Sequence, residues 1–126
     1  MRGFGCGGCN GAWPTQAFNY IGSYGLANTA DYPYIATSQT CKDTLTPKTN
    51  YLIPSQTYTS ITSTSVLSKL STGPLSICVD ASLWNSYSSG ILSCRSKVSI
   101  NHAVVLVGVD TSGNWKVRNS WGIGWG

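Results

Sequence analysis

The sequence predicts an α+β protein in which a helix precedes a group of antiparallel strands. Near the start, apolar residues of segment 13–21 recur at helical spacing. Near the end, the Val/Leu-rich segment 103–109 is followed by a turn and a second short strand pattern. A chain of 126 residues is long enough to bury an ordinary hydrophobic core.

The predicted helix at residues 13–21 has recognisable start and stop signals. Pro14 suits the first turn because its missing N–H needs no partner there, and Gly25 suits the residue past the end. The preceding residues, 1–11, form a Gly/Cys-rich loop. The helix should therefore emerge directly from this loop.

The middle of the chain, residues 31–64, is turn-rich and shows little periodicity. We expect extended connections there, with a domain change near Pro54. Residues 1–54 and 55–126 would then form two separate domains.

The second half predicts mainly strands. Residues 65–70 form a short helix, and 75–81 a strand that is apolar on alternate residues. The near-continuous apolar run at 103–109 is typical of a strand buried on both faces. The turn at 110–114 leads back into a partner strand at Trp115–Arg118.

Composition excludes several classes of function. The net charge is +4, and the eight basic residues are scattered, whereas a nucleic-acid-binding protein clusters them. No apolar run approaches the roughly 20 residues of a membrane-spanning helix, and we expect no secretion signal at the start. Low charge with abundant Ser, Thr, Gly and Tyr is typical of secreted or lumenal domains.

The five cysteines are many for this length and odd in number. Cys6 and Cys9 form a C-x-x-C motif, which is an alternative metal or redox site. A zinc site would need two more close ligands, and a redox motif a thioredoxin-like βαβ context. Neither is visible, so we expect no metal and no cofactor.

His102 is the only histidine, and Asn119 follows it by 17 residues. A lone histidine is usually a surface or core residue. Here, however, it heads the predicted strand, and Asn119 follows the strand that returns beside it. An amide oxygen at that place can accept one ring N–H, fix the tautomer and leave the other ring nitrogen for a nucleophile.

Five ordered blocks resemble the papain family of cysteine proteases, of the cathepsin L type. They are G-C-N-G-A-W-P at 8–14, Y-P-Y at 32–34, G-P-L-S-I at 73–77, N-H-A-V at 101–104 and N-S-W-G-x-x-W-G at 119–126. The resemblance covers nearly the whole chain. It implies a papain-like two-domain fold, with a partial helical domain followed by an antiparallel β-barrel domain that is truncated at its C-terminus.

The resemblance also implies site residues. His102 would be the general base, and Asn119 its orienting partner, with Trp121 covering their hydrogen bond. The substrate-binding positions would be Gly11, Ala12, Trp13, Pro14, Cys78, Ile100, Asn101, Ala103 and Trp121. Gly11 and Ala12 would pair with the substrate main chain, although Ala12 replaces the family's usual glycine and its methyl would crowd the substrate.

The apolar members of this set, Trp13, Pro14, Cys78, Ile100 and Ala103, would surround the pocket for the second residue before the scissile bond. They favour a hydrophobic substrate side chain. A cysteine at position 78 would make this pocket sensitive to oxidation or alkylation.

None of the cysteines lies in the family's nucleophile motif, C-G-[SA]-C-[WY]. Family spacing places it about 130 residues before the histidine, outside this chain. We therefore expect the chain alone to be inactive. Cys9, Cys41 and Cys94 resemble half-cystines with partners outside the chain, whereas Cys6 has no clear counterpart.

The predicted function is thus that of a cysteine-type endopeptidase whose nucleophile lies elsewhere in the protein. The alternative is a catalytically inactive papain-fold protein that serves as a binding or structural module. Expected partners are peptide or protein substrates, with no nucleic acid and no membrane, and the protein would be a monomer. The resemblance implies a lysosomal or secreted location.

Overall fold

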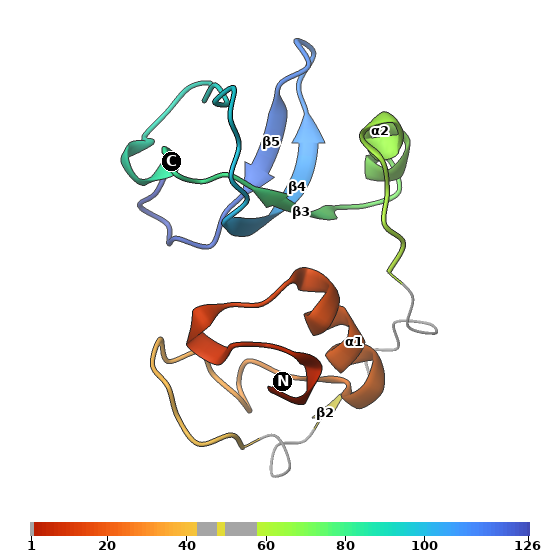
Figure 1. Ribbon diagram of the computed structural model, residues 1–126, viewed down its shortest axis with the longest axis vertical. Coiled ribbons are helices and arrows are strands. Elements are labelled where there is room, and N and C mark those ends of the chain that lie inside the picture. The colour runs from red at the N-terminus through yellow and green to blue at the C-terminus, as the bar shows by residue number, and fades with distance from the viewer. Residues whose placement is uncertain (1, 43–47, 50–57) are drawn as a thin grey trace. The chain divides into compact units, whose positions relative to one another are not determined.

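The computed structural model describes residues 2–42, 48–49 and 58–126. The chain divides into two compact units, Met1–Ser60 and Ile61–Gly126 (Figure 1). The predicted domain boundary near Pro54 lies outside the described residues and stays a prediction.

The first unit is built around helix α1. Its elements are the short 3-10 helices η1 (Arg2–Phe4) and η2 (Gly8–Asn10), the helix α1 (Pro14–Tyr24), and the two-residue strands β1 (Leu26–Ala27) and β2 (Lys48–Thr49). The strands pair antiparallel. Strand β2 lies in the segment for which the sequence predicted extended connections and no strand. A strand of two residues is too short to give a periodic pattern in the sequence.

Helix α1 confirms the helix predicted for residues 13–21 and extends it to Tyr24. The Trp13 N–H, just before the helix, donates to Gln16 Oε1 at 2.8 Å. At the other end, Gly25 has a φ of 74°, and its N–H donates to the Ile21 carbonyl at 2.8 Å. This left-handed conformation favours glycine, which explains the stop signal.

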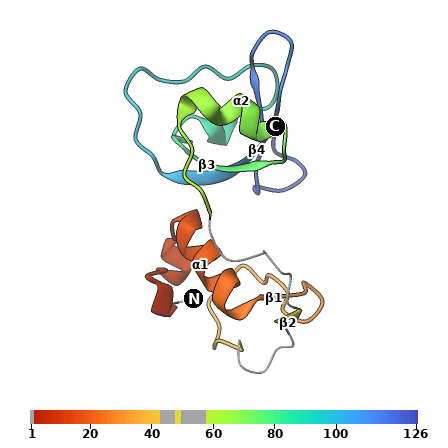
Figure 2. The same ribbon diagram turned by 90° about the vertical axis from the view of Figure 1, so that its right-hand side faces the viewer.

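The second unit contains most of the regular structure. Its elements are η4 (Ser63–Ser65), α2 (Val66–Leu70), β3 (Leu75–Val79), η5 (Trp84–Ser86), β4 (His102–Val109) and β5 (Trp115–Arg118). The three strands form an antiparallel sheet in the order β3-β4-β5, and α2 leads into β3 through a short turn (Figure 2). The helix contacts β4.

Burial along β4 alternates, so the expectation that this strand is buried on both faces is wrong. Val104 and Leu106 are buried, at 6% and 2% exposure, whereas Val105 and Val107 are 37% and 46% exposed. Successive side chains of a strand point to opposite faces. Only one face of the sheet is covered by described residues, and an apolar run does not tell which face that is.

The turn between β4 and β5 is the hairpin predicted at residues 110–114. Asp110 Oδ1 accepts from the N–H groups of Ser112 and Asn114 at 2.9 and 2.8 Å, and its Oδ2 accepts from Asn114 Nδ2 at 2.9 Å. These bonds, the Asn114 side chain first, lower the pKa of Asp110. These bonds lie within the turn itself, at the opposite end of β4 from His102.

The prediction of an α+β protein is confirmed. Strand β3 is shorter than predicted, because it ends at Val79 and the predicted strand ended two residues later. In the described part of the chain, no helix combines the length and apolar character needed to cross a membrane.

Candidate active site

The sheet brings His102 and Asn119 together. His102 begins β4, and Asn119 follows the last residue of β5. Because β5 runs antiparallel to β4, with Val105 opposite Arg118, the chain returns to the start of β4. The His102 Nε2 atom and the Asn119 Oδ1 atom are 2.9 Å apart.

A second hydrogen bond establishes the direction of the first. The Ser120 main-chain N–H, which can only donate, lies 2.8 Å from Asn119 Oδ1. The atom facing the ring is therefore the amide oxygen, and it accepts from His102 Nε2–H. In the neutral ring the other nitrogen, Nδ1, is then the proton acceptor.

The remaining amide group of Asn119 is buried. Its Nδ2 atom has no hydrogen-bond partner among the described residues. The orientation of this side chain thus depends on its oxygen, which two donors share.

Trp121 lies against the histidine ring. The two ring centroids are 5.0 Å apart with an interplanar angle of 33°. The Trp121 ring covers one side of the His102 ring, and Trp121 is itself 39% exposed. An aromatic cover excludes water that would compete for the Nε2–H bond.

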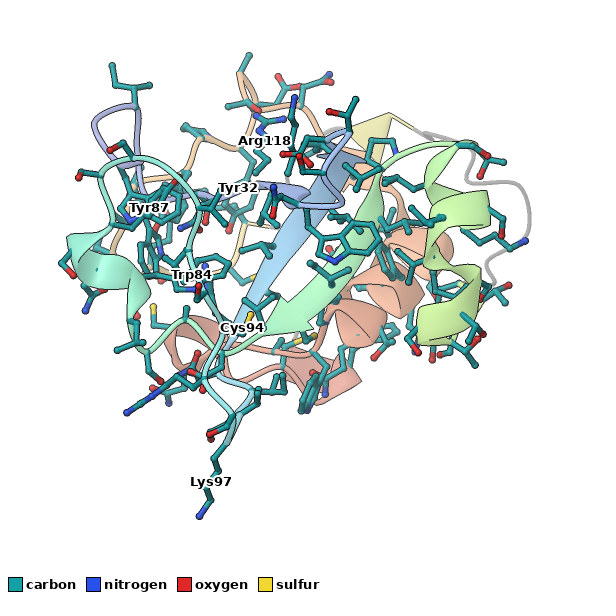
Figure 3. All side chains as sticks on the ribbon, turned by 90° about the horizontal axis from the view of Figure 1, so that it is seen from above. Tyr32, Trp84, Tyr87, Cys94, Lys97 and Arg118 are labelled. Carbon is teal, nitrogen blue, oxygen red and sulfur yellow. The ribbon has the colours of Figure 1, made fainter. Side chains whose placement is uncertain are left out.

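Sequence reasoning missed further aromatic residues around this pair. Trp84 meets the His102 ring edge-on at 6.3 Å and stacks on Trp125 at 6.0 Å. Trp125 also contacts Tyr87 at 5.3 Å and donates its indole N–H to the Trp84 carbonyl at 2.9 Å. Figure 3 shows Trp84 and Tyr87 on the same side of the unit. The second Trp-Gly pair of the motif at 119–126 is the sequence feature that could have predicted the contribution of Trp125.

The predicted substrate-binding residue Asn101 uses its side chain within the protein. Its Oδ1 accepts from the Ala81 N–H at 2.9 Å, and its Nδ2 donates to Ser82 Oγ at 3.0 Å. Its main-chain N–H donates to the Val79 carbonyl at 3.0 Å. Asn101 is therefore held to the end of β3 and to the two residues Ala81 and Ser82 that follow it closely.

Two of the predicted pocket residues lie directly opposite each other. Cys78 of β3 pairs with Ala103 of β4. They share one face of the sheet, whereas Val79 and His102 share the other. Cys78 is half-buried, and Ile100, just before this stretch, is 48% exposed.

The other predicted substrate residues form a continuous segment of the first unit. Gly11 has a φ of 90° and a ψ of −176°, a conformation that essentially only glycine adopts. Its carbonyl accepts from the Gly7 N–H at 2.9 Å. Ala12 and Trp13 are exposed, and Pro14 begins α1.

All five cysteines belong to the described residues, and each is a free thiol. Cys9 Sγ lies 3.1 Å from Ser38 Oγ. In the ranges that the structure describes, no three His, Cys, Asp or Glu side chains gather into a group that could hold a metal ion.

Comparison with known proteins identifies the family. A model described as "Papain family cysteine protease" matches residues 2–126. The chain belongs to this family, and its fold is papain-like α+β.

Two curated relatives from Paramecium tetraurelia are similar over 120 residues: Cathepsin L 2 at 44% identity and Cathepsin L 1 at 42%. Each alignment covers 94% of this chain and 37% of the relative, so the chain spans little over a third of their length. Among solved structures, the bromelain protease from Ananas comosus in complex with the E64 inhibitor is 35% identical. Its TM-score is 0.76, with 94% of this chain and 58% of that chain covered.

Proposed function

We propose that this chain supplies the general base and the orienting amide of a cysteine-type endopeptidase. The observation that carries the proposal is the hydrogen bond from His102 Nε2 to Asn119 Oδ1, with its direction set by Ser120. It leaves Nδ1 as an acceptor, as thiol activation requires.

The reaction follows from that geometry. His102 Nδ1 takes the proton of a cysteine thiol, and the thiolate attacks the peptide carbonyl carbon to form a C–S bond. The imidazolium then gives its proton to the leaving amine as the C–N bond breaks. Water, deprotonated by the same nitrogen, hydrolyses the thioester and regenerates the thiol.

The nucleophile would come from a part of the protein that this chain does not contain. None of the five cysteines has the sequence C-G-[SA]-C-[WY] around it. We therefore expect no peptide hydrolysis from residues 1–126 alone.

For substrate binding, we propose that Gly11 and Ala12 pair with the peptide main chain. No described residue makes a hydrogen bond to the main chain of Ala12, and the space beside Gly11 is open. Ala12 does not have a positive φ, so its methyl is accommodated without backbone strain. Trp13 and Pro14 follow as apolar contacts.

On the second unit, we propose that Cys78, Ile100 and Ala103 receive an apolar substrate side chain. Their support is the shared face of Cys78 and Ala103 and the exposure of Ile100. The main-chain carbonyl of Asn101 would accept a substrate N–H, and Trp121 would border the reacting bond.

The partners would be peptide or protein substrates, and the protein would act as a monomer in lysosomes or outside the cell. Family membership supports such a location.

The alternative is an inactive papain-fold binding protein. The intact pair of His102 and Asn119 favours the enzyme, because an inactive protein has no chemical need for both residues. Replacement of the nucleophilic cysteine in the longer protein would support the alternative.

The test is hydrolysis of a fluorogenic peptide by the longest reading frame that contains this chain. We expect thiol-dependent hydrolysis that iodoacetamide and E64 inhibit. The His102→Ala variant should lose at least about 10³-fold in kcat/KM, whereas Lys97→Ala, which changes an exposed side chain far out on its loop, should not (Figure 3). A folded protein without hydrolysis would contradict the proposal.

A further inference from the structure

The segment that leads into His102 is fastened to the end of β3 by a network centred on Asp80. Asp80 Oδ2 accepts from the Ser99 N–H at 3.0 Å, and its Oδ1 accepts from both the hydroxyl and the N–H of Ser82. Asn101 continues the connection through its bonds to Ala81 and Ser82. Residues 99–101 are therefore held at several points directly before His102.

The carboxylate sets the direction of every bond in this network. All three groups that face Asp80 donate, so an acceptor is needed at both of its oxygens. The Ser82 hydroxyl donates its only hydrogen to Asp80. Its oxygen therefore acts as the acceptor for Asn101 Nδ2. The amide oxygen of Asn101 is then turned toward the Ala81 N–H, where it is observed.

We propose that Asp80 is a positioning residue for His102, acting through Ser82 and Asn101. The role assigned to His102 rests on the proposed function. Asn101 is the last residue before β4. Its main-chain N–H donates a hydrogen bond to the Val79 carbonyl, which continues the pairing of β3 with β4 one residue past the Val79–His102 pair. Fixing Asn101 fixes where the strand begins, and with it the distance from the His102 ring to Asn119.

The hydrogen bonds that Asp80 accepts also favour its ionised form. The pKa of Asp80 is lowered to about 2 by the Ser82 hydroxyl, by the N–H groups of Ser99 and Ser82, and by the charge of Arg95. The carboxylate therefore remains ionised, and both of its oxygens remain acceptors, at pH values above this pKa.

The experiment measures solvent exchange of the His102 Nε2 proton in the chain of residues 1–126, by NMR with ¹⁵N-labelled histidine. Because His102 is the only histidine, its ring signals need no assignment. The Asp80→Asn variant replaces one carboxylate oxygen with an NH₂ group. Because both oxygens accept hydrogen bonds from N–H or O–H donors, this NH₂ group faces a donor and at least one hydrogen bond is lost. We expect exchange to accelerate about tenfold through local opening.

The matched control is Asp110→Asn. Asp110 also accepts three hydrogen bonds in a turn of the same unit, but these bonds stay within residues 110–114, at the opposite end of β4 from His102. Its substitution should leave the exchange of the ring proton within a factor of about two. Equal acceleration in both variants would overturn the proposal, because it would reflect general loosening.

A second pair keeps the test decisive if Asp80→Asn does not fold. Ser82→Ala removes the link to Asn101 and should accelerate exchange, whereas Ser82→Thr keeps the hydroxyl and should restore slow exchange. No difference between these two would also overturn the proposal. The measurement needs no turnover, so failure of the longer protein to hydrolyse peptides would contradict the proposed function alone.

Discussion

The two units present their proposed functional residues in different ways. In the second unit, His102 begins β4 and Asn119 follows β5, and the two residues meet only because the sheet is formed. In the first unit, residues 11–14 are consecutive and are held by local bonds such as Trp13 to Gln16. Side-chain chemistry here depends on long-range packing, whereas main-chain recognition needs only a correctly shaped loop.

Burial follows the same division. Ala81, Val104 and Leu106 are the buried apolar residues of the second unit among those described, against Cys6 alone in the first. We therefore expect core substitutions to disturb the proposed catalytic pair, and expect the proposed substrate loop to respond mainly to changes in its own backbone.

The largest expected effect is on the core of the second unit. Leu106→Ala should lower the free energy of unfolding of the second unit by about 3 kcal/mol, because the side chain is 2% exposed and leaves a cavity. Urea unfolding followed by tryptophan fluorescence measures this, since four of the five tryptophans lie in that unit.

The neighbouring variant Val107→Ala is the control. That side chain is 46% exposed on the other face, and its loss should cost less than about 1 kcal/mol. Similar losses for the two variants would show that burial along β4 does not alternate.

Next in size is the effect of Asn119→Ala on catalysis by the longer protein. Without the accepting oxygen, His102 loses its fixed tautomer and orientation, and kcat should fall about 10²-fold with little change in KM. Asn114→Ala removes a comparable amide from the hairpin turn and is the control. An equal fall in kcat in both variants would contradict a specific role of the His102–Asn119 hydrogen bond in catalysis.

How far the sequence predicts this structure differs along the chain. The helix limits follow from Pro14 and Gly25, whose backbone preferences act locally. The hairpin at 110–114 follows from turn residues between two strand patterns. The pairing of His102 with Asn119 was predicted because both residues flank that one hairpin.

What sequence reasoning missed depends on contacts between distant residues. Ser99 reaches Asp80 across 19 positions, and Trp125 reaches Trp84 across 41. No periodicity connects such residues. The exposed face of β4 was misjudged because a Val/Leu run looks the same whether one face is covered or both.

A smaller effect is expected in the first unit. Gly11→Ala should destabilise the proposed substrate loop by about 1–2 kcal/mol, because its φ of 90° with extended ψ strains any other residue. Gly3→Ala, at an ordinary φ with open space around it, is the matched control. Amide hydrogen exchange in α1 would compare them, and equal protection in the two variants would contradict the glycine requirement.

The smallest effect is on stability in acid. The pKa values of Asp80 and Asp110 are lowered by folding, so each contributes stability above its ordinary pKa and loses it as the pH falls through the folded value. The urea midpoint of the second unit should drop between about pH 4 and pH 2. Both carboxyl groups are exposed, so the fall in the urea midpoint should be modest. In Asp80→Asn the midpoint should depend less on pH, because one of the two titrating groups is gone. A midpoint that is constant over this range would contradict it.

The most direct test of the proposed catalytic pair is the tautomer of His102, read from its two ¹⁵N ring shifts at a pH where the ring is neutral. We predict a single form with the proton on Nε2 and a bare Nδ1, replaced in Asn119→Ala by a mixture that exchanges rapidly. A proton on Nδ1 in the unsubstituted chain, or identical spectra for the two proteins, would contradict the role of His102 as a general base oriented by Asn119.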